Sequence, residues 1–248
     1  MLEVNYKKGG LRVKEIWFAR RPYLIKGANK TVFMECYEKI DLEGFRQDGF
    51  DTSIIDLSKD LDSIWKNMKE KSCRYAIKRA QRDGIEIEIN KNYREFFKIV
   101  NKFLKAMGLE GLSRNRFEQI KDKGVLFTAR QRGEFICGNF YLNDDRNIRL
   151  LFSASRRYST TDKTKITLIG NANKLIHWEA VKYAKEKGLV EYDLGGVFLD
   201  KQNPAYSNTE FKLSFGGELV KRYNYKSYSS GLSYLWEGAI IISNKIFR

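Results

Sequence analysis

The stretch from Val190 to Val220 constrains the fold of this chain more than any other. A strand pattern, Val190–Leu194, runs directly into Gly195-Gly196, and a second glycine pair follows at Gly216-Gly217. Adjacent glycines at a strand end let a backbone or a ligand approach closely, because no Cβ atom is in the way. Asp193 adds a carboxylate at the edge where open α/β sheets hold ligands. A glycine turn beside a solvated aspartate is the alternative interpretation.

Charge is the strongest bias in the composition. The 248 residues include 46 Lys and Arg against 31 Asp and Glu, which gives a net charge of +15. Such a field concentrates phosphates, nucleic acid or an anionic membrane surface around a protein, without selecting among them. Apolar residues make up 42% of the chain, which supplies material for a packed core and is typical of a folded protein.

The cysteines and the chain ends predict a cytoplasmic protein. Cys36, Cys73 and Cys137 are scattered and lack the spacing of a zinc site, so we expect free thiols and no metal. The start lacks the apolar core of a signal peptide, and no apolar run approaches the roughly 20 residues that span a bilayer. The tail from Leu232 to Phe247 is apolar, and we expect it to be buried or to contact the inner membrane face peripherally.

Hydrophobic periodicity predicts a mixed order of helices and strands. The expected strands are 13–19, 31–37, 51–57, 85–89, 125–130, 135–142, 148–154, 190–194 and 219–225. The expected helices are 61–83 with Ser58 as its cap, 93–107, 114–123, 164–187 and 209–215. In helix 61–83 the apolar stripe changes phase near Lys71, which indicates a break or bend there.

This order, strand, two helices, three antiparallel strands, helix, strand, helix and strand, resembles the GNAT acyltransferase fold. VEYDLGGV at Val190–Val197 and FKLSFGG at Phe211–Gly217 resemble the closing pattern of the FemAB-like branch of that superfamily. The basic segment Arg74–Ile85 resembles the helix that leads into the first core strand, and Ala172–Gly188 resembles the long central helix.

The resemblance implies a mixed α/β (α+β) fold with a GNAT-like splayed, largely antiparallel mixed sheet and helices on both faces. We expect the FemAB-like GNAT domain at 51–228, with its core from about residue 85. A β-rich extension at 1–50 precedes it, and the tail at 229–248 follows.

The branch contains aminoacyl transferases that build cell-wall peptide bridges and acyltransferases that act on amino groups. We expect an N-acyltransferase that moves an acetyl or similar group from acyl-CoA to an amine of an anionic cell-envelope, lipid-linked or nucleotide-linked precursor. Wall-bridge members usually carry two such domains and this chain has room for one, which favours acyl-CoA as the donor.

An aminoacyl-tRNA-dependent transferase is the alternative. A non-enzymatic, basic nucleic-acid-binding module is a further one. Neither donor is a tightly bound cofactor.

In the GNAT arrangement the sheet splays between its fourth and fifth core strands, and backbone amides there contact the acyl carbonyl. The resemblance therefore places Leu194, Gly195 and Gly196 beside the donor. Asp193 is our candidate for orienting or deprotonating the amine, and Lys212 for stabilising the oxyanion or holding a phosphate. Glu210 and Asp200 are weaker base candidates. Pairing with a loop amide for Asp193 and a solvated helix position for Lys212 are the alternatives.

Two basic segments are candidate anion sites. The donor's pyrophosphate is expected at Arg156, Arg157, Thr164 and Lys165, because helix first-turn amides and the helix dipole favour an anion. A helix stripe of Lys71, Arg74, Lys78 and Arg82 is a candidate for binding tRNA or diphosphate phosphates, with a solvated face as the alternative. The lone histidine, His177, is interpreted as a packing or a surface residue rather than a catalytic one.

Overall fold

The computed structural model describes residues 1–231 and 235, which form two compact units. Unit 1 contains residues 1–50, 114–120 and the chain from 221 onward, and unit 2 contains 51–113 and 121–220. Residues 114–120 and 221–228 group with unit 1. The domain bounds expected from the sequence, 1–50, 51–228 and 229–248, stay a prediction. The expected apolar tail from Leu232 lies outside the described residues, apart from residue 235.

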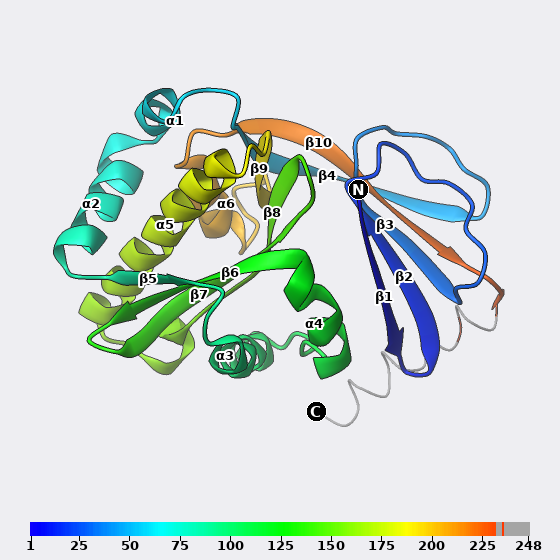
Figure 1. Cartoon of the computed structure of the whole chain (residues 1–248), viewed down its shortest axis with the longest axis horizontal. Coiled ribbons are helices and arrows are strands. Elements are labelled where there is room, and N and C mark those ends of the chain that lie inside the picture. Colours follow the sequence, from blue (N-terminus) through cyan, green and yellow to red (C-terminus); the bar gives the residue numbers. More distant parts are fainter. Residues whose placement is uncertain (232–234, 236–248) are drawn as a thin grey trace. The chain divides into compact units, whose positions relative to one another are not determined.

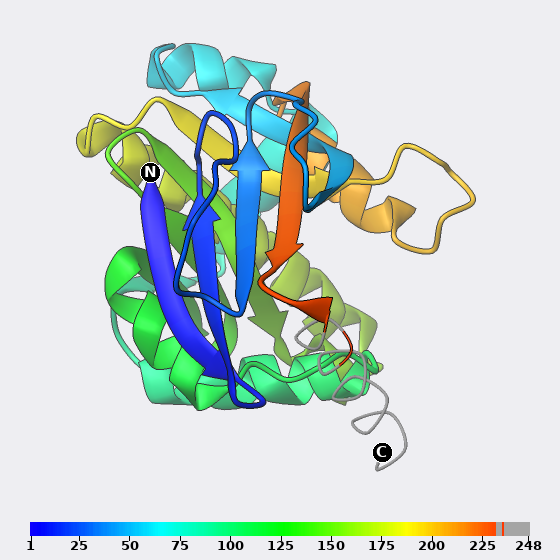
Figure 2. The same cartoon turned by 90° about the vertical axis from the view of Figure 1, so that its right-hand side faces the viewer.

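Unit 1 is built on four strands, which Figure 2 shows side by side. Strand β1 (Leu2–Lys8) is antiparallel to β2 (Leu11–Trp17), β2 is parallel to β3 (Lys30–Cys36), and β3 is antiparallel to β10 (Glu218–Tyr228). Its core is formed by Ile16, Ala19, Phe33, Cys36 and Tyr225. Helix α4 (Arg114–Ile120) is fixed to this unit by an ion pair of 3.0 Å between Arg116 and Glu15.

The sheet of unit 2 has the strand order β4-β9-β8-β7-β6-β5. The strands are β4 (Phe45–Asp56), β5 (Glu86–Ile89), β6 (Gly124–Gln131), β7 (Glu134–Asn143), β8 (Asn147–Ser155) and β9 (Glu191–Val197). All neighbours in this sheet are antiparallel except β8 and β9, which are parallel. The largely antiparallel mixed sheet that we expected is confirmed.

Helices cover both faces of this sheet, as expected (Figure 1). On one face, the long helix α5 (Lys163–Glu186) presents Asn173 to Asn139 of β7. On the other face lies α3 (Tyr93–Ala106), where Phe96 would be 3.0 Å from a Cβ atom built on Gly138. Side chains alternate between the faces of a strand, so Gly138 and Asn139 point to opposite helices.

The expected helix 61–83 is broken, and the phase change near Lys71 marks the break. Helix α1 (Leu61–Asn67) ends where Met68 turns extended, a π-helical turn covers Glu70–Arg74, and α2 (Tyr75–Arg82) follows. Lys69 N–H, between the two helices, donates to Ser214 O at 2.9 Å. The cap of α1 is Asp60 rather than Ser58, because the Asp60 carboxylate accepts the Ser63 N–H.

Within the described part of the chain, no helix is both long and apolar enough to cross a membrane. The three cysteines are free and buried. Burial raises the pKa of the Cys73 thiol to about 11, so this thiol is protonated at neutral pH.

Candidate functional site

Strands β8 and β9 pair over only three positions, from Asn147–Glu191 to Arg149–Asp193. Beyond that point β8 stays paired with β7 as far as Ser155, and β9 stays paired with β4 as far as Val197. The two strands therefore separate, and the sheet opens into a wedge between the fourth and fifth strands counted from β5. The splayed sheet expected from the resemblance is present.

Asp193 lies at the closed end of this wedge and is 6% exposed. Its Oδ1 accepts hydrogen bonds from the Thr52 hydroxyl and, at 2.6 Å, from the Gly195 N–H. Its Oδ2 lies 3.5 Å from Arg149 Nε. A carboxylate held by three partners and shielded from solvent fixes the backbone around it. This geometry favours positioning over proton abstraction as the role of Asp193.

Lys212 is carried by the short helix that follows β9. It stands near the end of α6 (Tyr206–Leu213), and its ammonium donates to Gly196 O at 2.6 Å. One turn earlier, the buried Thr209 hydroxyl donates to Phe198 O and accepts from Phe198 N–H. Residues three apart share a helix face, so Thr209 and Lys212 both hydrogen-bond the backbone at the end of β9. The ammonium is thereby fixed beside the wedge.

The absence of a side chain at Gly195 lets the Lys212 ammonium lie close to the backbone at the end of β9. Gly195 has φ 87°, a left-handed conformation that favours glycine, and a Cβ atom there would lie 3.4 Å from Lys212 Nζ. Its N–H is already bonded to Asp193. Leu194 is fully buried in the core. The structure thus brings Gly195, Gly196 and Lys212 together, while the Leu194 side chain belongs to the packing of unit 2.

The two weaker base candidates are exposed. Glu210 lies on the outer side of α6, and Asp200 lies in the loop that follows β9. The Asp200 carboxylate accepts the Gln202 N–H at 2.9 Å, which is a local turn contact. Nothing in these positions adds support for a role in proton transfer, which stays a prediction for both residues.

A buried polar cluster behind the wedge was missed by sequence reasoning. His177 Nδ1 lies 2.6 Å from the Tyr192 hydroxyl, and that hydroxyl donates to Tyr141 Oη at 3.0 Å. The rings of Phe211 and Phe215 pack against the imidazole, at centroid distances of 5.6 and 4.9 Å. Only the i, i+4 spacing of these two phenylalanines on either side of Lys212 hinted at a shared contact. The cluster joins α5 to the helix that carries Lys212.

Burial lowers the pKa of His177 to about 3, and the positive charges of Lys212 and Lys174 act in the same direction. Burial also raises the pKa of Tyr192 well above its usual value. Both groups are therefore neutral at physiological pH. Of the two expected alternatives, the structure makes His177 a packing residue rather than a surface one, and the imidazole is hydrogen-bonded as well.

The expected pyrophosphate segment is arranged differently from our expectation. The N-cap of α5 is Asp162, whose carboxylate accepts the N–H groups of Thr164 at 2.8 Å and Lys165 at 3.4 Å. These first-turn amides already have an anionic partner. Arg156 lies 3.8 Å from Glu95 of α3, and Arg157 is exposed in the turn before α5. The reason for placing pyrophosphate on these amides is removed, and donor binding by this segment stays a prediction.

The basic stripe is interrupted by the π-helical turn. Lys71 is exposed in that turn, and Arg74 pairs with Glu70 at 3.6 Å. Lys78 and Arg82 are exposed on α2, where they line a hollow together with Tyr75. The four cations therefore do not form one continuous helical face. Anion binding by them also stays a prediction.

No protein-family model matches this chain. No curated protein is similar to it in sequence. Its backbone, however, superposes on the crystal structure of FemX with a TM-score of 0.63, at 15% identity, over 84% of this chain and 74% of FemX. This chain has the fold of FemX. The fold that the resemblance implied is confirmed.

Two further structures share this FemX-like fold. One is the C-terminal domain of a putative lysylphosphatidylglycerol synthetase from Agrobacterium fabrum, with a TM-score of 0.53, 11% identity, and coverage of 86% of this chain and 72% of that one. The other is L-PGS from Bacillus licheniformis, with a TM-score of 0.53, 13% identity, and coverage of 88% and 73%. In all three the match covers more of this chain than unit 2 contains.

Proposed function

We propose that this chain is an acyltransferase that moves an acyl or aminoacyl group from an anionic carrier to an amine, with the reacting carbonyl in the wedge between β8 and β9. One observation carries the proposal: the Lys212 ammonium is fixed on Gly196 O beside Gly195, where the two strands part. A FemX-like fold with a cation in this position supports transfer chemistry more than a purely binding role.

The reaction needs an oxyanion to be stabilised. The amine nitrogen attacks the carbonyl carbon, and the carbonyl electrons move to oxygen. When the carbonyl re-forms, the bond to the carrier breaks, and the carrier leaves as a free thiol or hydroxyl with the proton that the amine nitrogen has lost. In this proposal the positive charge of Lys212 stabilises the oxyanion, while the buried His177 and Tyr192 stay neutral. Asp193 is a positioning residue that holds Gly195 and Arg149 in place.

Two carriers fit a net charge of +15: an acyl-CoA and an aminoacyl-tRNA. Acyl-CoA was favoured because the chain has room for one domain. The match to FemX over 84% of this chain weakens that reason. Separately, the capped start of α5 removes the support for a coenzyme A pyrophosphate on its first-turn amides. One neighbour's name, lysylphosphatidylglycerol synthetase, describes an aminoacyl group joined to a lipid. We therefore propose aminoacyl-tRNA as an equal alternative donor, and an anionic, lipid-linked or nucleotide-linked molecule of the cell envelope as the acceptor.

Binding and transfer should be measured separately. Coenzyme A, uncharged tRNA and aminoacyl-tRNA are titrated calorimetrically against the purified chain. Transfer is followed as release of free thiol or deacylated tRNA in the presence of a panel of amines. Lys212→Met should lower transfer by about 100-fold or more while donor affinity stays within about twofold, because the charge acts mainly in the transition state. Lys201→Met, at an exposed lysine of the loop before α6, is the matched control and should behave as wild type.

The alternatives give different results. A nucleic-acid-binding module would bind tRNA with a steep salt dependence and release no acyl group from any donor. Wild-type transfer by Lys212→Met would remove the oxyanion role. Loss of donor affinity in that variant, with the rate at saturation kept, would make Lys212 a phosphate ligand instead.

A further inference from the structure

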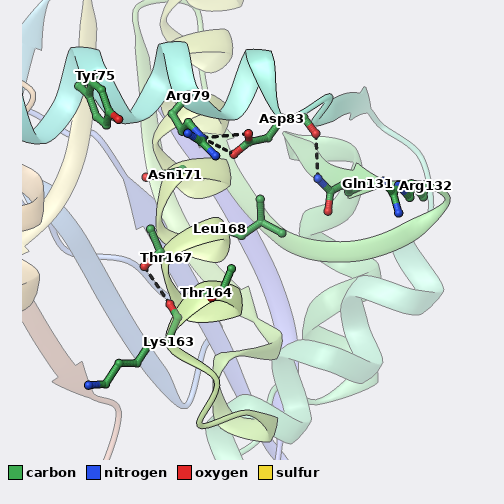
Figure 3. Close-up of a pocket in the computed structure, with 10 residues that line it drawn as sticks. All are labelled: Tyr75, Arg79, Asp83, Gln131, Arg132, Lys163, Thr164, Thr167, Leu168 and Asn171. Atoms are coloured by element: carbon green, nitrogen blue, oxygen red, sulfur yellow. Dashed lines mark hydrogen bonds and ion pairs between the residues drawn. The ribbon is translucent and has the colours of Figure 1, made fainter.

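Unit 2 contains a cavity of about 800 Å³ that the proposed transfer step does not use (Figure 3). It lies where α2, the turn between β6 and β7, and the first turns of α5 come together. Its lining consists of Tyr75, Arg79, Asp83, Gln131, Arg132, Lys163, Thr164, Thr167, Leu168 and Asn171. A volume of this size accommodates a nucleotide-sized ligand.

Positive charge dominates the lining. Arg79, Arg132 and Lys163 contribute three cations, against the single carboxylate of Asp83. Arg79 Nε already lies 2.9 and 3.0 Å from the two Asp83 oxygens, so that carboxylate is neutralised inside the cavity. Arg132 and Lys163 are exposed on two different elements. The cavity therefore presents an excess of positive charge from more than one direction, which suits a group with several negative oxygens.

The walls are held in place without a ligand. Gln131 Nε2 donates to Asp83 O at 2.8 Å, which ties the β6–β7 turn to the end of α2. Beneath the cavity α2 packs on α5 through small, buried residues, among them Ala80 and Ala172. Figure 3 shows Arg79 and Asp83 of α2 above Leu168 of α5. A preformed site of this kind needs little ordering when a ligand binds.

Tyr75 adds an aromatic surface to this charge. Its side chain is 56% exposed and borders both the cavity and the neighbouring hollow, which is lined by Lys78 and Arg82. An exposed ring among cations can stack on a base while the cations bind its phosphates.

The cavity lies close to the helix that carries Lys212. Asn171 lines it, and three residues further along α5 the Lys174 ammonium lies 5.4 Å from the centroid of the Phe211 ring. Three residues of α-helix rise about 5 Å, so one extended ligand can reach from the cavity toward α6. Phe211 immediately precedes Lys212 in the sequence.

We propose that this cavity binds nucleotide phosphates of the acyl carrier, with Arg79, Arg132 and Lys163 on the phosphate oxygens and Tyr75 against a base. This proposal rests on the proposed transferase function, whose carbonyl site is the wedge. The shared chemistry is a nucleotide phosphate. It belongs to the adenosine 3′,5′-bisphosphate end of coenzyme A, or to the nucleotides at the acceptor end of a tRNA.

The test uses the full chain and a charge-matched pair of variants. Arg132→Gln with Lys163→Gln removes two cavity cations and leaves the Arg79–Asp83 pair intact. Arg94→Gln with Lys98→Gln removes two exposed cations from α3 on the opposite face of the sheet. Adenosine 3′,5′-bisphosphate, coenzyme A and tRNA are titrated against each at one ionic strength. Equal melting temperatures confirm that both double variants fold.

We expect the cavity variant to bind one class of probe about tenfold or more weakly than wild type, and the α3 variant to stay within about twofold. Weaker binding of adenosine 3′,5′-bisphosphate and coenzyme A identifies a coenzyme A carrier, and weaker binding of tRNA alone identifies a tRNA carrier. Tyr75→Ala should weaken the nucleotide probe and spare inorganic pyrophosphate. Unchanged affinities in the cavity variant, or equal losses in both double variants, would overturn the proposal.

The outcome separates this inference from the transferase proposal. If nucleotide binding depends on the cavity cations but Lys212→Met transfers at the wild-type rate, the cavity proposal is supported and the oxyanion role of Lys212 is wrong. If transfer depends on Lys212 while Arg132→Gln with Lys163→Gln binds and transfers as wild type, the cavity proposal fails and the transferase stands.

Discussion

Arg149 and Asp193 face each other at the last paired position of β8 and β9, with Arg149 Nε 3.5 Å from Asp193 Oδ2. Their side chains are only 13% and 9% exposed. Opposite charges thus hold the two strands together at the point where they part. A charge with so little access to water is stable only beside its countercharge. The pair therefore fixes the position at which the two strands separate.

Asp193→Asn should lower the free energy of unfolding by about 3 kcal/mol. The substitution leaves Arg149 largely buried without its countercharge and weakens the bond to the Gly195 N–H. Urea denaturation measures the loss, and Arg149→Met combined with Asp193→Asn should recover part of it because no charge is then left unpaired. A fully stable Asp193→Asn that turns over more than about tenfold more slowly would instead support the role in proton transfer inferred from the sequence.

Gly195→Ala should reduce transfer by about tenfold or more while the chain still folds. The backbone there has φ 87°, and the new methyl group would lie 3.4 Å from the Lys212 ammonium. We expect a loss of stability of about 1–2 kcal/mol from backbone strain. Gly170→Ala is the control, because that position in α5 has no neighbour within 4 Å and prefers alanine as a helix position. Equal transfer by the two variants would argue against a close approach at Gly195.

His177 should make the chain less stable as the pH falls below about 6.5. Its pKa is about 3 in the folded chain, against an ordinary value of 6.5 for histidine, so between these values the unfolded chain binds a proton that the folded chain excludes. Stability therefore falls as the pH is lowered through this window, by about 2 kcal/mol between pH 7 and pH 5. The measurement is urea denaturation at several pH values. His177→Phe should show a shallower dependence, and an unchanged slope would contradict the burial of a neutral imidazole.

Gly216→Ala should destabilise the chain by about 3 kcal/mol or more. The residue has φ 73°, and a Cβ atom there would lie 2.3 Å from Asn67 O, a backbone atom at the end of α1. Gly84→Ala separates the two causes, since Gly84 has φ 70° but nothing within 4 Å. We expect Gly84→Ala to lose only the strain contribution, about 1 kcal/mol. Similar melting temperatures of the two variants would show that the backbone at Asn67 can move aside and relieve the contact.

Much of the fold was predictable because local patterns encode it. The alternation in 135–142 predicted β7, the periodicity of 164–187 predicted α5, and the glycine pairs marked both ends of the segment that holds Lys212. Strand β1 was missed, although its Leu2, Val4 and Tyr6 alternate with polar residues, because the charged and polar residues around them made the start of the chain read as polar. The resemblance in the closing motifs then led to the wedge.

What the sequence by itself determined is most of the order of the elements, the glycine pair at the end of β9 and the placing of Lys212 on a short helix. Only the tertiary structure decided that Asp193 is enclosed by Thr52 and Arg149, that Arg156 faces Glu95, and that α2 and α5 bound a cationic cavity. The reason is physical. Periodicity and glycine conformation act between neighbours in the chain, whereas the state of a charge depends on partners about 40 to 140 residues away, which only folding brings within a few ångströms.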